Sequence, residues 1–225
     1  MSDTTHDRIA VVDFGGQYAH LLASRIRRLG CYSEILPADV SPDAARSYAG
    51  LVYSGGPASV YDADSVQSDP ALLGLGIPVL GICYGHQLLA HALGGRVARN
   101  PRGREIGSVE VEALPAARDD ALLGALPVRL TVQATHVESV LELPPGARLL
   151  AVSRGDPHHA FSAGARAWGV QFHPEFDAEV IRGYLEARRE ILGREGLDAA
   201  ALLAGVRESE DGRALLRRFA ELVSR

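Results

Sequence analysis

Short apolar runs alternate with helical patterns over the first 93 residues of the chain. The run Arg8–Asp13 is rich in β-branched residues and ends near a Gly-Gly pair, which is typical of a strand buried on both faces of a parallel sheet. Residues 17–29 place apolar side chains on one helical face, and Gly30 stands where a left-handed C-cap is expected. Further strands are predicted over 31–36, 51–54 and 78–83, and a helix over 84–93.

From Gly107 the pattern changes to strand-like segments joined by short turns. Their predicted bounds are 108–113, 128–134, 147–152, 159–162 and 167–172. After Pro174 the pattern is helical again, over 178–192, 199–206 and 212–223. The chain therefore predicts an α/β fold: a flavodoxin-like, doubly wound, mostly parallel sheet with an antiparallel extension and a C-terminal helical appendage.

Two units follow from this division, a main domain over 1–176 and an appendage over 177–225. Apolar residues of the appendage recur at spacings near three and four, so its helices should bury one face against the main domain or a partner. These residues are Ile181, Leu185, Ile191, Leu192, Leu202 and Leu203.

Composition and charge narrow the function. With 47% hydrophobic and 23% charged residues in 225, the chain is an ordinary globular protein rather than a disordered one. Its formal net charge of −5 has the wrong sign for coating nucleic acid or an anionic membrane, and Arg99, Arg102 and Arg104 are interpreted as a solvated loop. All 23 basic residues are Arg, so no lysine is available for a Schiff base or a phosphate loop.

Cellular location is predicted from the N-terminus and the cysteines. The polar start of the chain does not resemble a signal peptide, and no apolar stretch approaches the 18 residues of a membrane span. Two cysteines, Cys31 and Cys83, are too few for a disulfide framework in a chain of this length. We therefore expect a cytoplasmic protein with reduced thiols, one of which is available for chemistry.

The segment Gly81-Ile-Cys-Tyr-Gly-His-Gln87 lies between a buried strand and an amphipathic helix. This is the form of a nucleophile elbow, in which flanking glycines relieve a crowded and strained turn. Cys83 would lie at the helix N-terminus, where the dipole and free amides favour a thiolate. An isolated cysteine at a strand end is more often core packing, but the surrounding motif favours a nucleophile.

A histidine and a carboxylate, His173 and Glu175, close the last strand-like segment. The strand period of two puts both on one side, so Glu175 can orient the imidazole while its other nitrogen faces a nucleophile. An isolated His-Pro-Glu is more often a surface turn. Together with the elbow, however, it predicts a Cys–His–Glu catalytic unit.

Adjacent glycines follow a third strand in Ser54-Gly55-Gly56-Pro57. Their backbone N–H groups can approach a ligand closely, so this segment and the N–H of Tyr84 are candidates for an oxyanion hole. A plain β-turn is the alternative.

Six ordered segments resemble the class I (triad-type) glutamine amidotransferases, most closely the glutaminase part of GMP synthetases. They are Asp13-Phe-Gly-Gly-Gln-Tyr18, Ser54-Gly-Gly-Pro-Ala-Ser-Val-Tyr61, Pro78-Val-Leu-Gly-Ile-Cys-Tyr-Gly-His-Gln87, Arg104-Glu-Ile-Gly107, Leu143-Pro-Pro-Gly146 and Gly169-Val-Gln-Phe-His-Pro-Glu175. The resemblance covers about residues 8–176.

This resemblance implies that Cys83 attacks the side-chain amide of L-glutamine, His173 moves protons and Glu175 orients His173. Oxyanion and substrate contacts would come from Gly55, Gly56, Tyr84, Gln87, Thr135 and His136. It implies no metal and no cofactor, and an ammonia-accepting synthetase as a separate partner.

The chain also departs from GMP synthetases. No phosphate loop of an ATP-pyrophosphatase domain follows residue 176, so a free-standing glutaminase that does not bind ATP is expected. Thr135-His-Val-Glu138 stands where the family segment usually reads Ser-His-Gly-Asp.

Two alternatives stay open at this point. A γ-glutamyl hydrolase or peptidase would use the same Cys83 thioester on a peptide, with a wider opening on the acceptor side. A flavodoxin-like interaction module without turnover is the other alternative, against which the intact Cys83, His173 and Glu175 argue.

Overall fold

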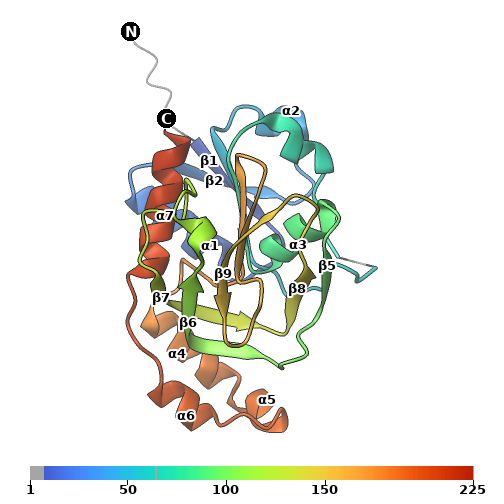
Figure 1. Cartoon of the computed structure of the whole chain (residues 1–225). Coiled ribbons are helices and arrows are strands. Elements are labelled where there is room, and N and C mark those ends of the chain that lie inside the picture. Colours follow the sequence, from blue (N-terminus) through green and yellow to red (C-terminus); the bar gives the residue numbers. More distant parts are fainter. Residues whose placement is uncertain (1–7, 64, 225) are drawn as a thin grey trace.

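A sheet of nine strands runs through the centre of the computed structural model, which describes residues 8–63 and 65–224 (Figure 1). In spatial order the strands are β2 (Tyr32–Pro37), β1 (Arg8–Asp13), β3 (Gly50–Tyr53), β4 (Val79–Ile82), β11 (Ala167–Val170), β10 (Ala160–Ala163), β9 (Arg148–Ser153), β6 (Glu105–Ala113) and β7 (Arg129–His136). The predicted doubly wound sheet with an antiparallel extension is confirmed.

Strand direction divides this sheet into two halves that meet at β11. Strands β2, β1, β3, β4 and β11 are mutually parallel, whereas β10, β9, β6 and β7 continue the sheet with antiparallel pairs. The sequence pattern assigned residues 167–172 to the antiparallel extension, but β11 pairs in parallel with β4, with Gly169 opposite Gly81. This pairing brings the segment after β11 beside the segment after β4.

Helices cover both faces of the parallel half, which explains its continuous apolar strands. Ile9 and Val11 of β1 pack in one core with α1 (Ala19–Arg28) and α7 (Asp211–Val223), and the alternate residues Ala10 and Val12 pack in a second core with α3 (Tyr84–Ala92). The remaining short helical segments of this half are α2 (Pro42–Ala45) and η1 (Pro70–Leu75), whereas η2 (Pro115–Ala117) packs on β9 in the antiparallel half.

A two-stranded antiparallel ribbon, β5 (Arg96–Arg99) and β8 (Glu138–Glu142), lies beside α3. The sequence pattern did not predict it, because both strands are short and their outer ends carry charged residues. Strand β8 begins at Glu138, directly after the turn that follows β7, so the ribbon lies next to the end of β7.

The C-terminal helices pack against two different parts of the sheet (Figure 1). Helix α7 lies on β7 and α1 and contributes Leu215, Leu216 and Phe219 to the core, whereas α4 (Ala178–Ala187) and α6 (Ala199–Ala204) lie on β6. The predicted helix 178–192 is wrong in one respect: the chain bends at Arg188 (φ −111°, ψ 9°), and a separate helix α5 (Arg189–Arg194) follows.

Burial of the six apolar appendage residues follows the prediction with one exception. Ile181, Leu185 and Leu192 are fully buried, and Leu202 and Leu203 pack partly against the same cluster, but Ile191 is 45% exposed. The bend after α4 turns Ile191 outward. No helix in the described ranges combines the length and the apolar character that crossing a membrane requires.

Candidate active site

Cys83 occupies a strained turn between β4 and α3. Its φ of 51° is the one positive value at a non-glycine position in the part of the chain that the structure describes. A Cβ at Gly81 would lie 2.4 Å from the carbonyl oxygen of Gly85, and one at Gly85 would lie 2.4 Å from that of Tyr53. Only glycines fit at both positions, so the elbow geometry predicted from the sequence is present.

His173 and Glu175 form a buried ion pair beside this turn. The Nδ1 atom of His173 lies 2.8 Å from Oε1 of Glu175, and the ring stacks on Phe176 with centroids 4.3 Å apart. The predicted contact is correct, but the strand argument for it is wrong, since β11 ends at Val170. The two residues meet across a turn around Pro174, closed by the N–H of Phe176 donating to the carbonyl of His173.

Burial and charge act in opposite directions on the thiol and the imidazole. Burial alone raises the pKa of Cys83, but the adjacent His173 lowers it below its ordinary value, through its charge and a hydrogen bond, and the charge of His136 adds to this. Burial likewise lowers the pKa of His173, but the charges of Glu175 and Cys83 raise it well above 6.5. The arrangement therefore favours a thiolate–imidazolium pair.

The cavity at Cys83 has two lobes that share this residue. One, here called the His173 lobe, has a volume of about 210 Å³ and walls formed by His173, Phe176 and Tyr184 among others. The other, here called the Gln87 lobe, has a volume of about 380 Å³ and is lined by Gln87 and Glu138 among others. Thr135 lines both lobes.

Gln87 and Thr135, predicted as substrate contacts, both line the cavity beside Cys83. The side-chain amide of Gln87 donates to the Glu138 carbonyl at 2.9 Å and to Oε1 of Gln171 at 3.1 Å, which fixes its orientation in the Gln87 lobe. The carbonyl oxygen of Thr135 lies 3.8 Å from Sγ of Cys83, and its buried hydroxyl has no hydrogen-bond partner among the described residues.

The glycines after β3 approach the site closely. Gly56 lines both lobes, and a Cβ at Gly55 would lie 3.0 Å from Cε1 of His173 and 3.7 Å from Cβ of Cys83. Tyr84 follows Cys83 as the first residue of α3. The backbone around Gly56 and Tyr84 thus lies beside the thiol.

His136 lies in the Gln87 lobe, but its ring nitrogens are already occupied. Nε2 lies 2.9 Å from Oε2 of Glu105, and Nδ1 lies 2.9 Å from the carbonyl oxygen of Glu138. Both neighbours are acceptors, an arrangement that favours a ring with a proton on each nitrogen, and the Ser139 hydroxyl lies 3.5 Å from Nδ1. Burial lowers the pKa of His136, but the hydrogen bond and charge of Glu105 with the charge of Asp156 raise it above 6.5.

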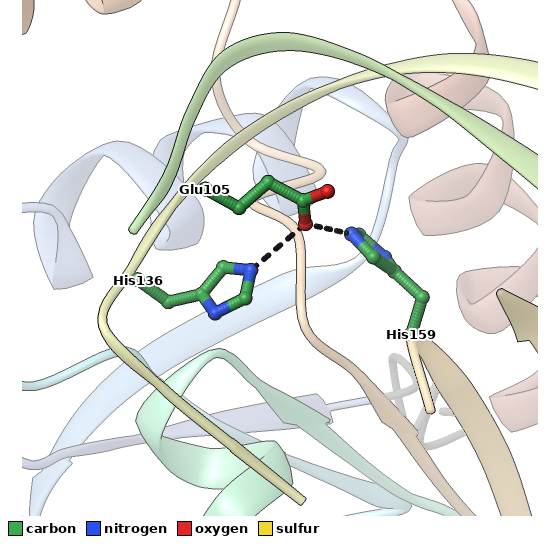
Figure 2. A group of neighbouring side chains, drawn as sticks. All are labelled: Glu105, His136 and His159. Atoms are coloured by element: carbon green, nitrogen blue, oxygen red, sulfur yellow. Dashed lines mark hydrogen bonds and ion pairs between the residues drawn. The ribbon is translucent and has the colours of Figure 1, made fainter. Parts of the chain in front are cut away.

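His159 completes this cluster by pointing its Nε2 atom at the same Glu105 oxygen, again at 2.9 Å (Figure 2). Glu105, His136 and His159 could offer one ligand atom each to a metal ion, because these atoms lie within 4.8 Å of one another. However, both separations are ordinary hydrogen-bond distances, and Oε1 of Glu105 accepts from Ser153. The hydrogen bonds account for the cluster without a metal.

Comparison with known proteins places the chain in a family. The family model "Glutamine amidotransferase class-I" matches residues 10–187. The chain belongs to that family. A GMP synthase [glutamine-hydrolyzing] of Aeropyrum pernix is 46% identical over 200 residues, covering 88% of this amidotransferase chain and 36% of the relative. One from Parafrankia sp. is 46% identical over 175 residues, covering 76% and 32%.

Solved amidotransferase structures share the fold over nearly the whole chain. A glutamine amidotransferase from Thermotoga maritima is 26% identical with a TM-score of 0.76, covering 98% of this chain and 99% of that one. One from Methylobacillus flagellatus is 28% identical with a TM-score of 0.67, covering 97% and 92%. The chain spans about a third of the length of the two GMP synthases.

Several residues around the amidotransferase cavity were not found from the sequence. Tyr184 lines both lobes and Arg188 lines the His173 lobe, although both belong to the C-terminal helices. Glu105 lies in the quoted Arg104-Glu-Ile-Gly107 segment, but that segment carried no predicted role. Only a tertiary arrangement brings Tyr184 and Arg188 to Cys83, so no local pattern could have indicated them.

Proposed function

We propose that this amidotransferase hydrolyses the side-chain amide of L-glutamine to glutamate and ammonia, and that an acceptor synthetase uses the ammonia. The observation that carries the proposal is Cys83, held at positive φ at the start of α3 with the His173–Glu175 pair against it. Such a thiol is a poised nucleophile rather than a packing residue.

In the first step the Cys83 thiolate adds to the amide carbon, and the negative charge moves to the carbonyl oxygen. The N–H groups of Gly56 and Tyr84 would stabilise this oxyanion. The C–N bond then breaks as imidazolium His173 gives its proton to the nitrogen, which leaves as ammonia. A water molecule, deprotonated by His173, attacks the γ-glutamyl thioester and releases glutamate and the Cys83 thiolate. Glu175 acts through His173 throughout.

The glutamyl part of the substrate fits the Gln87 lobe. This lobe is lined by Asp62 and Glu138, whose carboxylates suit the α-ammonium group, and by Gln87, whose side-chain amide suits another polar atom of the substrate. His136 acts there as a buried positive charge and support rather than through its own N–H groups, which Glu105 and Glu138 occupy.

The proposal is tested with the pure protein and L-glutamine by measuring ammonia and glutamate. A glutamine-like diazo-ketone should add mass at Cys83 alone and abolish turnover, and Cys83→Ala should be inactive with an unchanged fold by circular dichroism. Cys31→Ala is the matched control and should keep full activity. Labelling at Cys31, or turnover by Cys83→Ala, would contradict the assignment.

A further inference from the structure

The two lobes of the cavity have different roles if the proposed function is correct, and the inference below rests on that function. The glutamyl part of the substrate occupies the Gln87 lobe. The departing nitrogen must leave on the side of His173, because this residue supplies its proton. His173 lines the His173 lobe. The leaving group therefore departs into that lobe.

The His173 lobe is far larger than ammonia requires. Its volume of about 210 Å³ is several times the roughly 30 Å³ that a small molecule such as water occupies in the liquid. Its aromatic wall is continuous: Phe176 stacks on His173 at 4.3 Å, Tyr18 packs edge-on against Phe176 at 4.5 Å, and Tyr184 lies 6.5 Å from Phe176. An organic leaving group would fit between the thiol and this wall.

Arg188 supplies a positive charge at the far end of the same wall. Its guanidinium carbon lies 3.7 Å from the centroid of the Tyr184 ring, which holds the side chain in place. Among the described residues that line this lobe, none is Asp or Glu, and none of the ion pairs found in the described ranges includes Arg188. The guanidinium is thus free to bind an anionic ligand.

Two other arginines differ from Arg188, because a glutamate neutralises each of their guanidinium groups. Arg104, in the Gln87 lobe, makes two hydrogen bonds of 2.6 and 2.8 Å to Glu195. Arg189, the neighbour of Arg188, pairs with Glu186 at 2.7 Å on the exposed side of the helices. The bend between α4 and α5 turns Arg188, but not its neighbour Arg189, toward the cavity.

We propose that the enzyme also hydrolyses γ-glutamyl amides whose departing amine carries a carboxylate, with Arg188 binding that carboxylate. The substrate class is γ-glutamyl amino acids and short peptides. A planar guanidinium forms paired hydrogen bonds with a carboxylate, which makes it the suitable group for this recognition. Arg188 is a specificity residue in this scheme and takes no part in bond making.

The chemistry balances with the groups already described. Cys83 attacks the γ-carbonyl carbon, the C–N bond breaks, and the His173 proton goes to the amine, which leaves as a free amino acid. Water then cleaves the thioester to glutamate, and its proton returns to His173. No oxidant, reductant or further reactant is needed.

The test compares three substrates that differ only in the leaving amine: γ-glutamylglycine, γ-glutamylglycinamide and γ-glutamylmethylamide. We expect kcat/KM for γ-glutamylglycine to exceed that for the other two by about ten- to a hundredfold, the worth of one charge-assisted hydrogen-bond pair. In Arg188→Gln this ratio should fall toward one, and in Arg189→Gln, the matched control, it should stay as in the wild type. The wild-type ratio needs no variant, so an unstable Arg188→Gln protein does not obstruct the test.

Glutamine turnover, measured in the same preparations, separates the two proposals. Hydrolysis of glutamine with a wild-type ratio near one overturns the carboxylate site and leaves the glutaminase standing. A ratio that survives Arg188→Gln overturns the role of Arg188. Absence of turnover on glutamine and on all three amides overturns both proposals together.

Discussion

Two buried histidine–glutamate pairs lie on either side of the cavity, and they differ in what the second nitrogen of each ring faces. In the His173–Glu175 pair, Nδ1 contacts the carboxylate at 2.8 Å and the other nitrogen is left for Cys83. In the His136–Glu105 pair, Nε2 contacts the carboxylate at 2.9 Å and Nδ1 donates to the backbone carbonyl of Glu138. The first ring can exchange a proton with a nucleophile, and the second cannot.

The comparison shows that a raised histidine pKa does not by itself indicate catalysis. A glutamate raises the pKa of both rings above 6.5, and both rings are almost fully buried. A third histidine, His86, is also buried, but burial lowers its pKa to about 3, so it stays neutral beneath the elbow. What separates the three is the neighbour of each ring nitrogen, which a sequence motif does not specify.

Among substitutions in the two histidine–glutamate pairs, replacing His173 should have the largest effect on turnover. We expect His173→Ala to lower kcat for glutamine by about 10⁴-fold or more, because the thiolate loses both its counter-ion and its proton donor. His20→Ala, on the exposed face of α1, is the control and should behave as the wild type. Steady-state ammonia release measures both. A loss of tenfold or less in His173→Ala would contradict the role of His173 as counter-ion and proton donor.

Glu175→Gln should lower kcat by about one to two orders of magnitude less than His173→Ala does, because Glu175 acts only through the His173 ring. Its charge raises the pKa of His173 and, acting directly, also that of Cys83. Removing it should lower the His173 pKa. The alkaline limb of the pH profile of kcat/KM, which reports loss of the imidazolium proton, should therefore move to lower pH. Greater damage from Glu175→Gln than from His173→Ala would contradict these roles.

Glu105→Gln should act on stability rather than on the chemical step. Taking one charge from a buried pair costs about 3–5 kcal/mol of unfolding free energy, measurable by urea titration. Catalysis by the folded fraction should fall far less than in the His173 variant. Equal losses of turnover in the folded Glu105→Gln and His173→Ala proteins would make the two pairs functionally equivalent and break the comparison.

The same variant has a pH signature with two limbs. Hydrogen bonds from His136 and His159 keep the pKa of Glu105 below its usual 4.5 despite its burial, so this stabilisation is present above pH 4.5 and is lost as pH falls. The pKa of His136 is raised, so its contribution is complete below pH 6.5 and is lost as pH rises through the folded value. In Glu105→Gln the unfolding free energy should therefore change less as the pH falls below 4.5, and also less as the pH rises through the folded pKa of His136.

The sequence predicted the first pair well, whereas of the second it indicated only His136, as a substrate contact, and not the contact of His136 with Glu105. The elbow could be predicted because Gly81 and Gly85 flank Cys83 at positions where any side chain would collide with backbone. His173 and Glu175 could be predicted because their contact is local, although it crosses a turn rather than following a strand. Glu105 and His136 lie 31 residues apart and meet only through the register of β6 against β7.

Regions whose position depends on tertiary packing were the least predictable. The bend in the helix predicted over 178–192 falls at an Arg, residue 188, rather than at a helix-breaking Gly or Pro. The spacing of the apolar residues Leu185 and Leu192 also suits one continuous helix. The bend there sends Ile191 into solvent and Arg188 toward the cavity. The β5–β8 ribbon was not predicted because its strands, four and five residues long and of mixed polarity, show no clear hydrophobic period.

The smallest expected effect concerns His159, the second donor to Glu105. Its Nε2 donates to Oε2, but its buried Nδ1 has no partner among the described residues, and its ring stacks on Phe172 with centroids 5.7 Å apart. In His159→Phe the stacking stays and an unpartnered polar atom is removed, while Glu105 keeps His136 and Ser153 as donors. One lost hydrogen bond offset by one relieved polar group should change the unfolding free energy by no more than about 1 kcal/mol. A loss as large as that of Glu105→Gln would mean that the Glu105 charge is shared equally by both histidines, and His136 would no longer be the cationic partner that distinguishes this pair from His173–Glu175.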